Sequence, residues 1–423
     1  MWKHKLFPLS PLTTTWHQAV EVIDPGLHNR NAGPDFFNAK IKLNGTLWVG
    51  NVEIHDKASD WYVHGHDKDE RYDNVILHVC GTIDVEAKNS KGEPLVQLQL
   101  DIPENVSKHY QELLSIDQYP PCYQIIPSLT RLTVHSWMSA LQTERLSQKT
   151  DAIEARVKQC NGDWENAYFV TLARNYGFGI NGDAFEQWAY HLPLRAVDHH
   201  RDDIFQIEAI FLGQAGLLEL NTIPERYQKD ALNDGYFSRL RNEYLYLSHK
   251  FSLQPMDYKQ WRFLRLRPQN FPHIRISQLA NLYYNRRAGL SQLLEASTVK
   301  EAKQMLSTSV TEYWETHYTF GSTSIRNEKH LSPFSLNLLI INTMVPILFA
   351  YGRHRGEEKY CDRAFDFLEE LKAENNHIVR MWKECGLPVE NAGDSQALIQ
   401  LKKEYCDRKE CLRCRIGYEY LKR

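Results

Sequence analysis

The chain has 423 residues and a formal net charge of −3 at pH 7, with 42% hydrophobic and 24% charged residues. These values are typical of a globular protein of two or three domains, and they exclude a disordered or strongly basic chain. A role in nucleic-acid binding would therefore need a local basic surface.

Neither a secretion signal nor a membrane span is expected. The basic residues near Met1 are not followed by an apolar run of signal-peptide length. The longest apolar run, 338–350, is interrupted by Asn342, Thr343 and Pro346, so it predicts a buried helix. We predict a cytoplasmic protein without membrane contact. Its eight cysteines are expected to be reduced thiols or, where clustered, metal ligands. The oligomeric state stays open.

Strand patterns dominate the N-terminal part, residues 1–120. A weak alternation at 18–23 predicts a strand. Residues 36–43 and 47–55 flank Asn44-Gly45, a dipeptide typical of a two-residue hairpin turn. In the first of these strands the alternation places Phe37, Ala39, Ile41 and Leu43 on one face. Further β patterns follow at 75–80, 83–87 and 95–100.

The remainder, residues 121–423, has mainly helical periodicity. A proline pair at Pro120-Pro121 marks the boundary, because it cannot continue a helix. A cysteine-rich tail occupies 385–423. The predicted fold class is α+β, with an N-terminal β-rich unit followed by a large mainly α-helical region.

Acids and imidazoles concentrate around the predicted hairpin. Asp35 follows a Gly-Pro turn, and Glu53 and His55 lie two residues apart in the partner strand, so their side chains face the same side. If the hairpin forms, the strand end with Asp35 lies near the end with Glu53. Two converging carboxylates predict a site for a hard divalent cation, Mg²⁺ or Mn²⁺, which would activate water beside a phosphate.

The order Pro34-Asp35, then Glu53-Ile54-His55, resembles the restriction-endonuclease-like PD-(D/E)xK superfamily. The resemblance implies a nuclease-like α/β unit in which Asp35 and Glu53 bind the metal and His55 replaces the usual lysine. A histidine is not a fixed cation near neutral pH. The acid that many members carry on an upstream helix has no obvious counterpart, since the nearest acid, Glu21, is read on a strand.

Along its length the chain is also similar to an uncharacterised bacterial family of unknown function. The shared segments are Asn-Ala-Gly-Pro-Asp-Phe at 31–36 and Val-Glu-Ile-His at 52–55. This second resemblance implies no activity.

Further histidines and an acid are predicted to form the rim of the same site: His28, His64, His66, Asp69 and His78. His64 and His66 with Asp69 would also suit a transition metal, or they belong to a polar loop. His78 lies in an apolar run and is equally read as a core residue. A different alternative is a cupin-like enzyme with one metal, although a jelly roll needs about eight strands.

The helical part contains one basic aromatic segment. Arg262, Arg265 and Arg267 alternate with apolar residues, and Arg275 follows. Guanidinium groups bind phosphate in bidentate fashion, so these four are the predicted nucleic-acid contacts. The alternative is salt bridging between domains.

The tail predicts a structural metal. Cys406, Cys411 and Cys414 have the spacing of thiolate ligands, for Zn²⁺ or an iron–sulfur cluster. Cys385 or Cys361 is the expected fourth ligand, ahead of His354 or His377, and the alternative is a group of reduced thiols.

These observations favour a divalent-metal-dependent nuclease with nucleic acid as its partner. The competing hypothesis is a catalytically inactive nuclease-like module that binds nucleic acid or protein.

Overall fold

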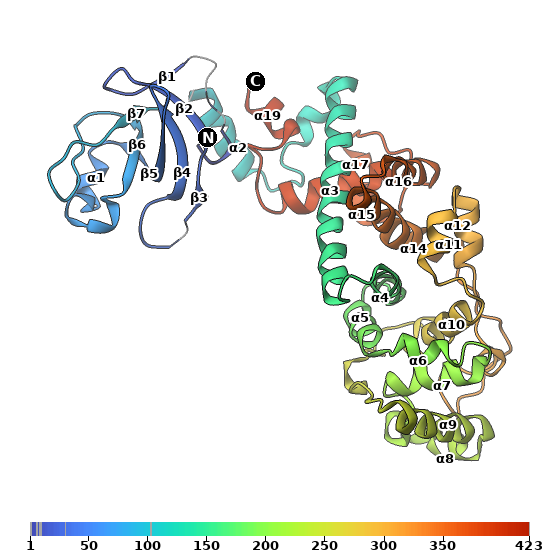
Figure 1. The fold of residues 1–423 in the computed structure, drawn as a ribbon. Coiled ribbons are helices and arrows are strands. Elements are labelled where there is room, and N and C mark those ends of the chain that lie inside the picture. Colours follow the sequence, from blue (N-terminus) through green and yellow to red (C-terminus); the bar gives the residue numbers. More distant parts are fainter. Residues whose placement is uncertain (1, 6, 8–10, 30, 102–103, 423) are drawn as a thin grey trace. The chain divides into compact units, whose positions relative to one another are not determined.

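The computed structural model describes residues 2–5, 7, 11–29, 31–101 and 104–422. The chain forms two compact units. The first contains residues 1–137, 384–387 and 401–423, and the second contains residues 138–383 and 388–400. The predicted α+β class is confirmed, because a mixed sheet in the N-terminal part is followed by a mainly helical region (Figure 1).

The first unit is built on a seven-stranded mixed sheet with the order β1-β2-β4-β5-β6-β7, in which β3 pairs with β4. Antiparallel pairing joins β1, β2, β4 and β5, whereas β5, β6 and β7 run parallel. The strands are β1 (Leu12–Thr13), β2 (Ala19–Asp24), β3 (Leu27–His28), β4 (Phe36–Leu43), β5 (Thr46–Lys57), β6 (Val75–Thr82) and β7 (Gln97–Gln99).

The predicted hairpin is confirmed. Leu43 pairs with Thr46 across a two-residue turn, where Asn44 and Gly45 have φ angles of 47° and 85°. Both angles lie in the left-handed region that this tight turn requires.

One detail of the predicted alternation is wrong. Phe36 is buried in place of Phe37, because the β4–β5 register shifts between Phe36 and Ala39, and Asn38 has a φ of 55°. This bulge turns the start of β4 by one residue relative to its remainder. Asp35 directly precedes it.

The predicted strand at 83–87 is also wrong. Two of its carbonyl groups accept from side chains, Val85 O from Gln97 and Glu86 O from Tyr62, and Ala87 O accepts from the Leu95 amide. The Asp84 carboxylate accepts from the Ser59 amide and hydroxyl at 2.9 and 2.8 Å. Because these polar groups are already bonded, the segment forms a loop that supports the β5–β6 connection.

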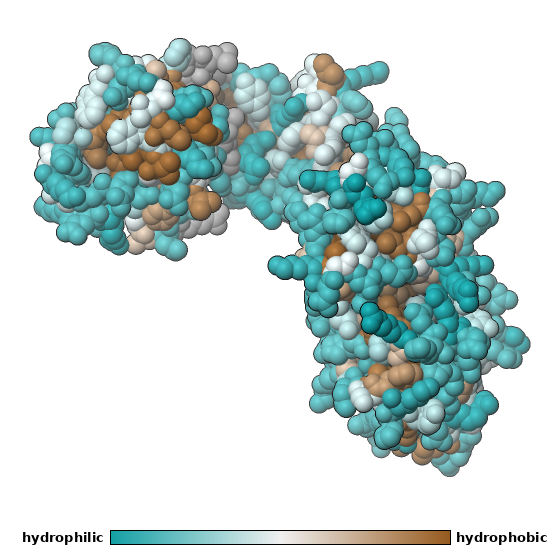
Figure 2. All heavy atoms as spheres, in the orientation of Figure 1, coloured by the Kyte–Doolittle hydropathy of each residue, from teal (hydrophilic) through white to brown (hydrophobic). Residues whose placement is uncertain are grey.

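That connection contains α1 (Asp60–Val63) and two short 3₁₀ turns. A small core beneath it consists of Trp61, Tyr72, Val75, Ala87 and Leu95. The main core of the sheet includes Ala39, Ile41, Val52, Leu77 and Leu98. In the view of Figure 2, apolar residues also gather on the surface over the sheet.

The first unit also contains helical segments from two distant parts of the chain. These are α2 (Glu104–Ser115), the start of α3 (Arg131–Gln159), a π-helix at Leu401–Cys406 and α19 (Arg415–Leu421). The C-terminal α19 contacts α2, and His109 Nδ1 lies 3.1 Å from Leu421 O (Figure 1).

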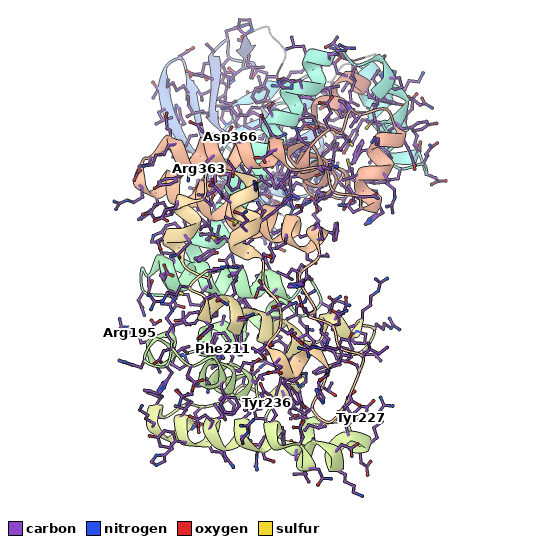
Figure 3. The ribbon with its side chains drawn as sticks, turned by 90° about the vertical axis from the view of Figure 1, so that its right-hand side faces the viewer. Arg195, Phe211, Tyr227, Tyr236, Arg363 and Asp366 are labelled. Carbon is purple, nitrogen blue, oxygen red and sulfur yellow. The ribbon has the colours of Figure 1, made fainter. Side chains whose placement is uncertain are left out.

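The second unit is helical and has one extensive core. After α3 it contains α4 (Trp164–Tyr176), α5 (Gly182–His191), α6 (Leu194–Asp198), α7 (Ile204–Gln214), α8 (Glu225–Asn233), α9 (Gly235–Phe251), α10 (Pro272–Tyr284), α11 (Leu290–Glu295), α12 (Val299–Leu306), α13 (Glu312–Glu315), α14 (Pro333–Leu339), α15 (Val345–Arg355), α16 (Glu358–Glu370), α17 (His377–Glu384) and α18 (Ala392–Gln400). In Figure 3, Phe211 of α7 and Tyr236 of α9 lie between stacked helices, and the Tyr236 hydroxyl donates to Glu208.

The apolar run at 338–350 is a buried helix, as predicted. It lies in the α14–α15 segment, Pro333–Arg355, which is long and apolar enough to cross a membrane. In its most apolar window 61% of the residues are buried inside the protein. Asn175 donates to Asn342 O and Thr343 Oγ1, both at 2.9 Å, so polar groups of the helix have partners within the second unit.

Candidate metal centre

The parallel pairing of β5 and β6 determines where the candidate site lies. Glu53 pairs with His78 and His55 pairs with Cys80 across the two strands. Glu53 and His55 are two residues apart and both are buried, with 5% and 8% exposure. The strand period therefore directs both side chains to the same covered face, which α1 and its neighbouring turns enclose.

The two acids of the site contact each other. The Asp35 amide donates to Glu53 Oε2 at 2.9 Å, and the Ile54 amide donates to Asp35 Oδ2 at 3.1 Å. Burial, reinforced by the negative charge of Asp35, raises the pKa of Glu53 to about 8. Burial also raises the pKa of Asp35. Because neither carboxylate is fully compensated, a divalent cation would stabilise the pair in its ionised form.

Three imidazoles face the acids. His66 Nε2 and His55 Nε2 lie 3.3 and 3.6 Å from Glu53 Oε1. His55 Nε2 is also 3.1 Å from His64 Nδ1. Among the described residues, these three histidines are the group of metal-ligating side chains whose ligand atoms all lie within 4.8 Å of one another. Gly65, with a φ of 72°, provides the sharp turn between His64 and His66.

His55 and His66 are suited to metal binding because burial keeps their imidazoles neutral. It lowers the pKa of His55 to about 4, with a further contribution from His66 and His64, and it lowers the pKa of His66. A neutral ring offers a nitrogen lone pair to a cation. His64 is exposed, so it forms the open side of the group.

A second layer holds these rings in place. His78 is fully buried, and its Nε2 lies 2.9 Å from His55 Nδ1. Gln97 Nε2 lies 3.4 Å from His78 Nδ1. Tyr72 stacks on His66 with a centroid distance of 3.8 Å, and the edge of Trp61 packs against His55 and His66. A cation at His55 Nε2 would select the arrangement in which His55 Nδ1 donates to His78.

Two residues predicted for the rim of the site, Asp69 and His28, lie outside the group of three histidines. Asp69 is engaged by Arg71, which donates from Nη2 to Oδ2 at 2.5 Å and lowers the pKa of Asp69 to about 2. His28 is exposed on β3, packs near Phe36 and acts on the Asp35 carboxyl through its charge. Glu21, the nearest upstream acid, forms a surface salt bridge with Lys42 at 3.2 Å and does not join the site.

The cupin-like alternative is incompatible with this fold. A jelly roll packs two antiparallel sheets, whereas the described strands form one mixed sheet with parallel β5, β6 and β7. The sequence-based prediction of the site also omitted Trp61, Tyr72 and Gln97. Trp61 and Tyr72 lie in the same acid- and histidine-rich stretch, but nothing local marked Gln97.

Comparison with known protein families matches the chain to a family described as "Protein of unknown function (DUF2851)", over residues 1–377. The chain belongs to this family. No curated protein and no solved structure matches the chain significantly. The expected membership of an uncharacterised family is confirmed, and since the family has no assigned activity, the resemblance to nucleases stays a prediction.

The arginines predicted as nucleic-acid contacts of this family member lie in two environments. Arg262, Arg265 and Arg267 are exposed in the second unit. Arg275 is 6% exposed, donates to Gln278 and Asn270, and lies 4.5 Å from the ring of Phe178. Its guanidinium is enclosed in the core and would reach a nucleic acid only if that core opened.

The cysteines proposed for the tail divide between the units. Cys385, Cys406, Cys411 and Cys414 belong to the first unit. Cys361 belongs to the second, where its Sγ lies 3.6 Å from Phe349 O, and the second unit also contains His354 and His377.

Proposed function

We propose that the protein is a divalent-metal-dependent phosphodiesterase acting on nucleic acid, with Asp35, Glu53 and the adjacent imidazoles as its metal centre. The observation that carries the proposal is the contact of the Asp35 amide with the buried Glu53 carboxylate, beside the three imidazoles of His55, His64 and His66. Its position at the start of β4 and on β5, next to a parallel β6, agrees with the motif order that suggested a nuclease-like unit.

The donor set narrows the choice of metal. Carboxylates alone suit Mg²⁺ and Mn²⁺, whereas imidazoles suit transition ions. A site with Glu53, His55, His64 and His66 within reach of one another therefore favours Mn²⁺ over Mg²⁺. When bound, the ion would supply Lewis acidity toward a phosphate oxygen and lower the pKa of water.

The residues of the chain have separate tasks in this proposal. Asp35 and Glu53 hold the cation. His64 and His66 are the imidazoles that would join them, and His55 then keeps Nε2 free to orient water or accept its proton, in the neutral form that it has above about pH 4. His78 positions His55 through their 2.9 Å contact.

A basic groove in the first unit supports the proposal that the substrate is a polyanion. The groove has a volume of about 740 Å³, and its lining includes Lys3, Lys5, His28, Arg413 and Arg415. His28 also acts electrostatically on Asp35, so it links the groove to the acids. Phosphate groups bound along these side chains would lie close to the metal centre.

The exposed arginines of the second unit are proposed as a further phosphate-binding surface. Replacing Arg262, Arg265 and Arg267 together by glutamine should weaken binding of all nucleic-acid sequences about equally and reduce its dependence on salt. Gel-shift titrations at two salt concentrations measure both effects.

Cleavage assays test the activity. Purified full-length protein should cleave at least one of plasmid DNA, single-stranded DNA and RNA with Mn²⁺, and less well with Mg²⁺. Asp35→Asn and Glu53→Gln should each lower the rate by at least about 100-fold, since each removes a metal-binding charge. Glu21→Gln is the matched control, because Glu21 is an acid of the same sheet outside the site.

The inactive-module hypothesis is distinguished by the same assays. It rests on His55, which stands where the superfamily has lysine. If the wild-type protein and Asp35→Asn behave alike on all three substrates with either metal, the enzyme proposal is rejected. Retained nucleic-acid binding would then favour the binding module.

A further inference from the structure

Four cysteines from distant parts of the chain surround one cavity in the first unit. Cys122 follows the Pro120-Pro121 pair, Cys406 ends the π-helix, Cys411 lies in the following turn, and Cys414 is the N-cap of α19. All four line a cavity of about 260 Å³. Cys385, the fourth ligand expected from the sequence, does not line it.

The backbone around this cavity is closely packed and directs polar groups into it. Gly417 has no side chain where a Cβ would lie 2.3 Å from the Cys411 carbonyl oxygen, so the turn before α19 packs directly on the helix. The backbone amides of Ile416 and Gly417 are directed at the Cys414 sulfur. Such N–H donors to sulfur are the outer-layer contacts that tune thiolate ligands.

The indole N–H of Trp137 is an independent indication that the cysteines bind a ligand. Trp137 is 92% buried, given its 8% exposure, and among the described residues its Nε1 has no hydrogen-bond partner of ordinary geometry. This N–H is directed at the Cys414 sulfur. A buried donor directed at a sulfur atom is better satisfied by a thiolate than by a thiol.

The four sulfur atoms also interact electrostatically. Cys406 lies within electrostatic reach of Cys414, Cys122 and Cys411, and all four are on the wall of the same cavity. Four thiolates in one buried cavity would require a positively charged centre between them.

The separation of the sulfurs distinguishes between metals. One zinc ion at about 2.3 Å from each ligand brings its four thiolates to roughly 3.8 Å from one another. Among the described residues, the group with three or more ligand atoms within 4.8 Å is the histidine group, not the cysteines. Sulfurs spread around a cavity suit a polynuclear centre. The spacing Cys406-x4-Cys411-x2-Cys414 with a remote fourth cysteine is also an iron–sulfur pattern.

The geometry points to an iron–sulfur cluster held by Cys122, Cys406, Cys411 and Cys414, which ties the C-terminal segment to the first unit. The cluster occupies a site separate from the histidine centre and does not depend on the proposed phosphodiesterase activity. Its ligands join Cys122, which follows α2, to the start of α19, so the cluster closes a very long loop.

Metal and sulfide analysis of the anaerobically purified full-length protein tests this inference. We expect iron and acid-labile sulfide in stoichiometric amounts, with visible absorption that bleaches on reduction. Reconstitution with iron and sulfide should restore all three properties after chelation. Cys122→Ser, Cys406→Ser, Cys411→Ser and Cys414→Ser should each lower the iron content at least several-fold.

Two controls keep the experiment decisive. Cys385→Ser and Cys160→Ser remove cysteines that do not line the cavity and should retain the iron of the wild type. Because a ligand variant can fail to fold, the wild-type content is decisive by itself. Zinc without sulfide, disulfides among the four cysteines, or no metal after anaerobic reconstitution would each overturn the inference. Loss of iron in Cys385→Ser but not in Cys122→Ser would overturn the ligand set.

Discussion

Glu53 is the residue at which the electrostatics of the site can be measured most directly. Its pKa of about 8 in the folded protein compares with 4.5 for an ordinary glutamate. Between these values the folded protein binds a proton that the unfolded chain releases, so stability falls as the pH rises. His55 has the opposite effect between pH 4 and 6.5, since its pKa is lowered to about 4. The range from pH 6.5 to 8 therefore isolates Glu53 from His55.

We predict that between pH 6.5 and 8 the chelator-treated wild-type protein loses up to about 2 kcal/mol more stability in its first unit than Glu53→Gln does, at most one proton's worth. Glu53→Gln should show a flatter dependence, because its amide does not titrate. Urea unfolding at the two pH values measures the difference, with Glu21→Gln as a control that should follow the wild type. Equal slopes for wild type and Glu53→Gln would show that Glu53 is ionised throughout.

Which functional side chains lie together could be predicted from the sequence where the partners are close along the chain. Glu53 and His55 share a face because the strand period is two, and His64 and His66 flank a glycine turn. Cys122 could not be found in this way. It lies far upstream of the other three cysteines, and only the packing of α19 against the segment after α2 brings it to them.

At the scale of elements, the pairing of β5 with β6 holds the site together. It places Glu53 opposite His78, and it requires close approach of the two strands at Gly50. A Cβ at Gly50 would lie 2.4 Å from Ile76 Cγ2 and 3.0 Å from Asn74 O. The branched side chain and the backbone carbonyl leave little room for adjustment.

Gly50→Ala should therefore destabilise the first unit by about 1–3 kcal/mol and weaken Mn²⁺ binding, because the strands must separate near the site. Gly235→Ala is the matched control, since nothing lies within 4 Å of a Cβ at that position and its φ is not in the left-handed region. Denaturant unfolding and metal titration measure both effects. Wild-type stability in Gly50→Ala would contradict the tight packing of β5 on β6.

The elements also show where local patterns fail. The strands 36–43 and 75–80 were predicted because alternation or an apolar run is a property of a few consecutive residues. The loop at 83–87 has the same β pattern, but the side chains of Tyr62 and Gln97 donate to two of its carbonyl groups, those of Glu86 and Val85. Those donors come from other elements, so a reading of the segment alone could not include them.

At the scale of the whole molecule, both ends of the chain build the first unit. Ile416, Tyr420 and Leu421 of α19 are buried, and α19 contacts α2 and the 3₁₀ turn at Tyr123–Ser128. The predicted division at residue 120 follows the chain, whereas the compact units group residues 401–423 with 1–137. A helical pattern identifies α19 but not the partner on which it packs.

Ending the chain after Gln400 should therefore destabilise the first unit and leave the second intact. Three buried side chains of α19 are lost, each worth about 1.5–3 kcal/mol when fully buried. Hydrogen exchange should accelerate in α2 and in the turn at Tyr123–Ser128, and remain slow in α7 of the second unit. Removing only 422–423 is the control and should leave exchange unchanged. Cys414→Ser in the full chain separates the two contributions of the tail, because it retains α19 and removes one sulfur. If α2 is protected equally in the truncated and full-length proteins, the tail is an appendage of the first unit, and the unit's stability comes from the sheet alone.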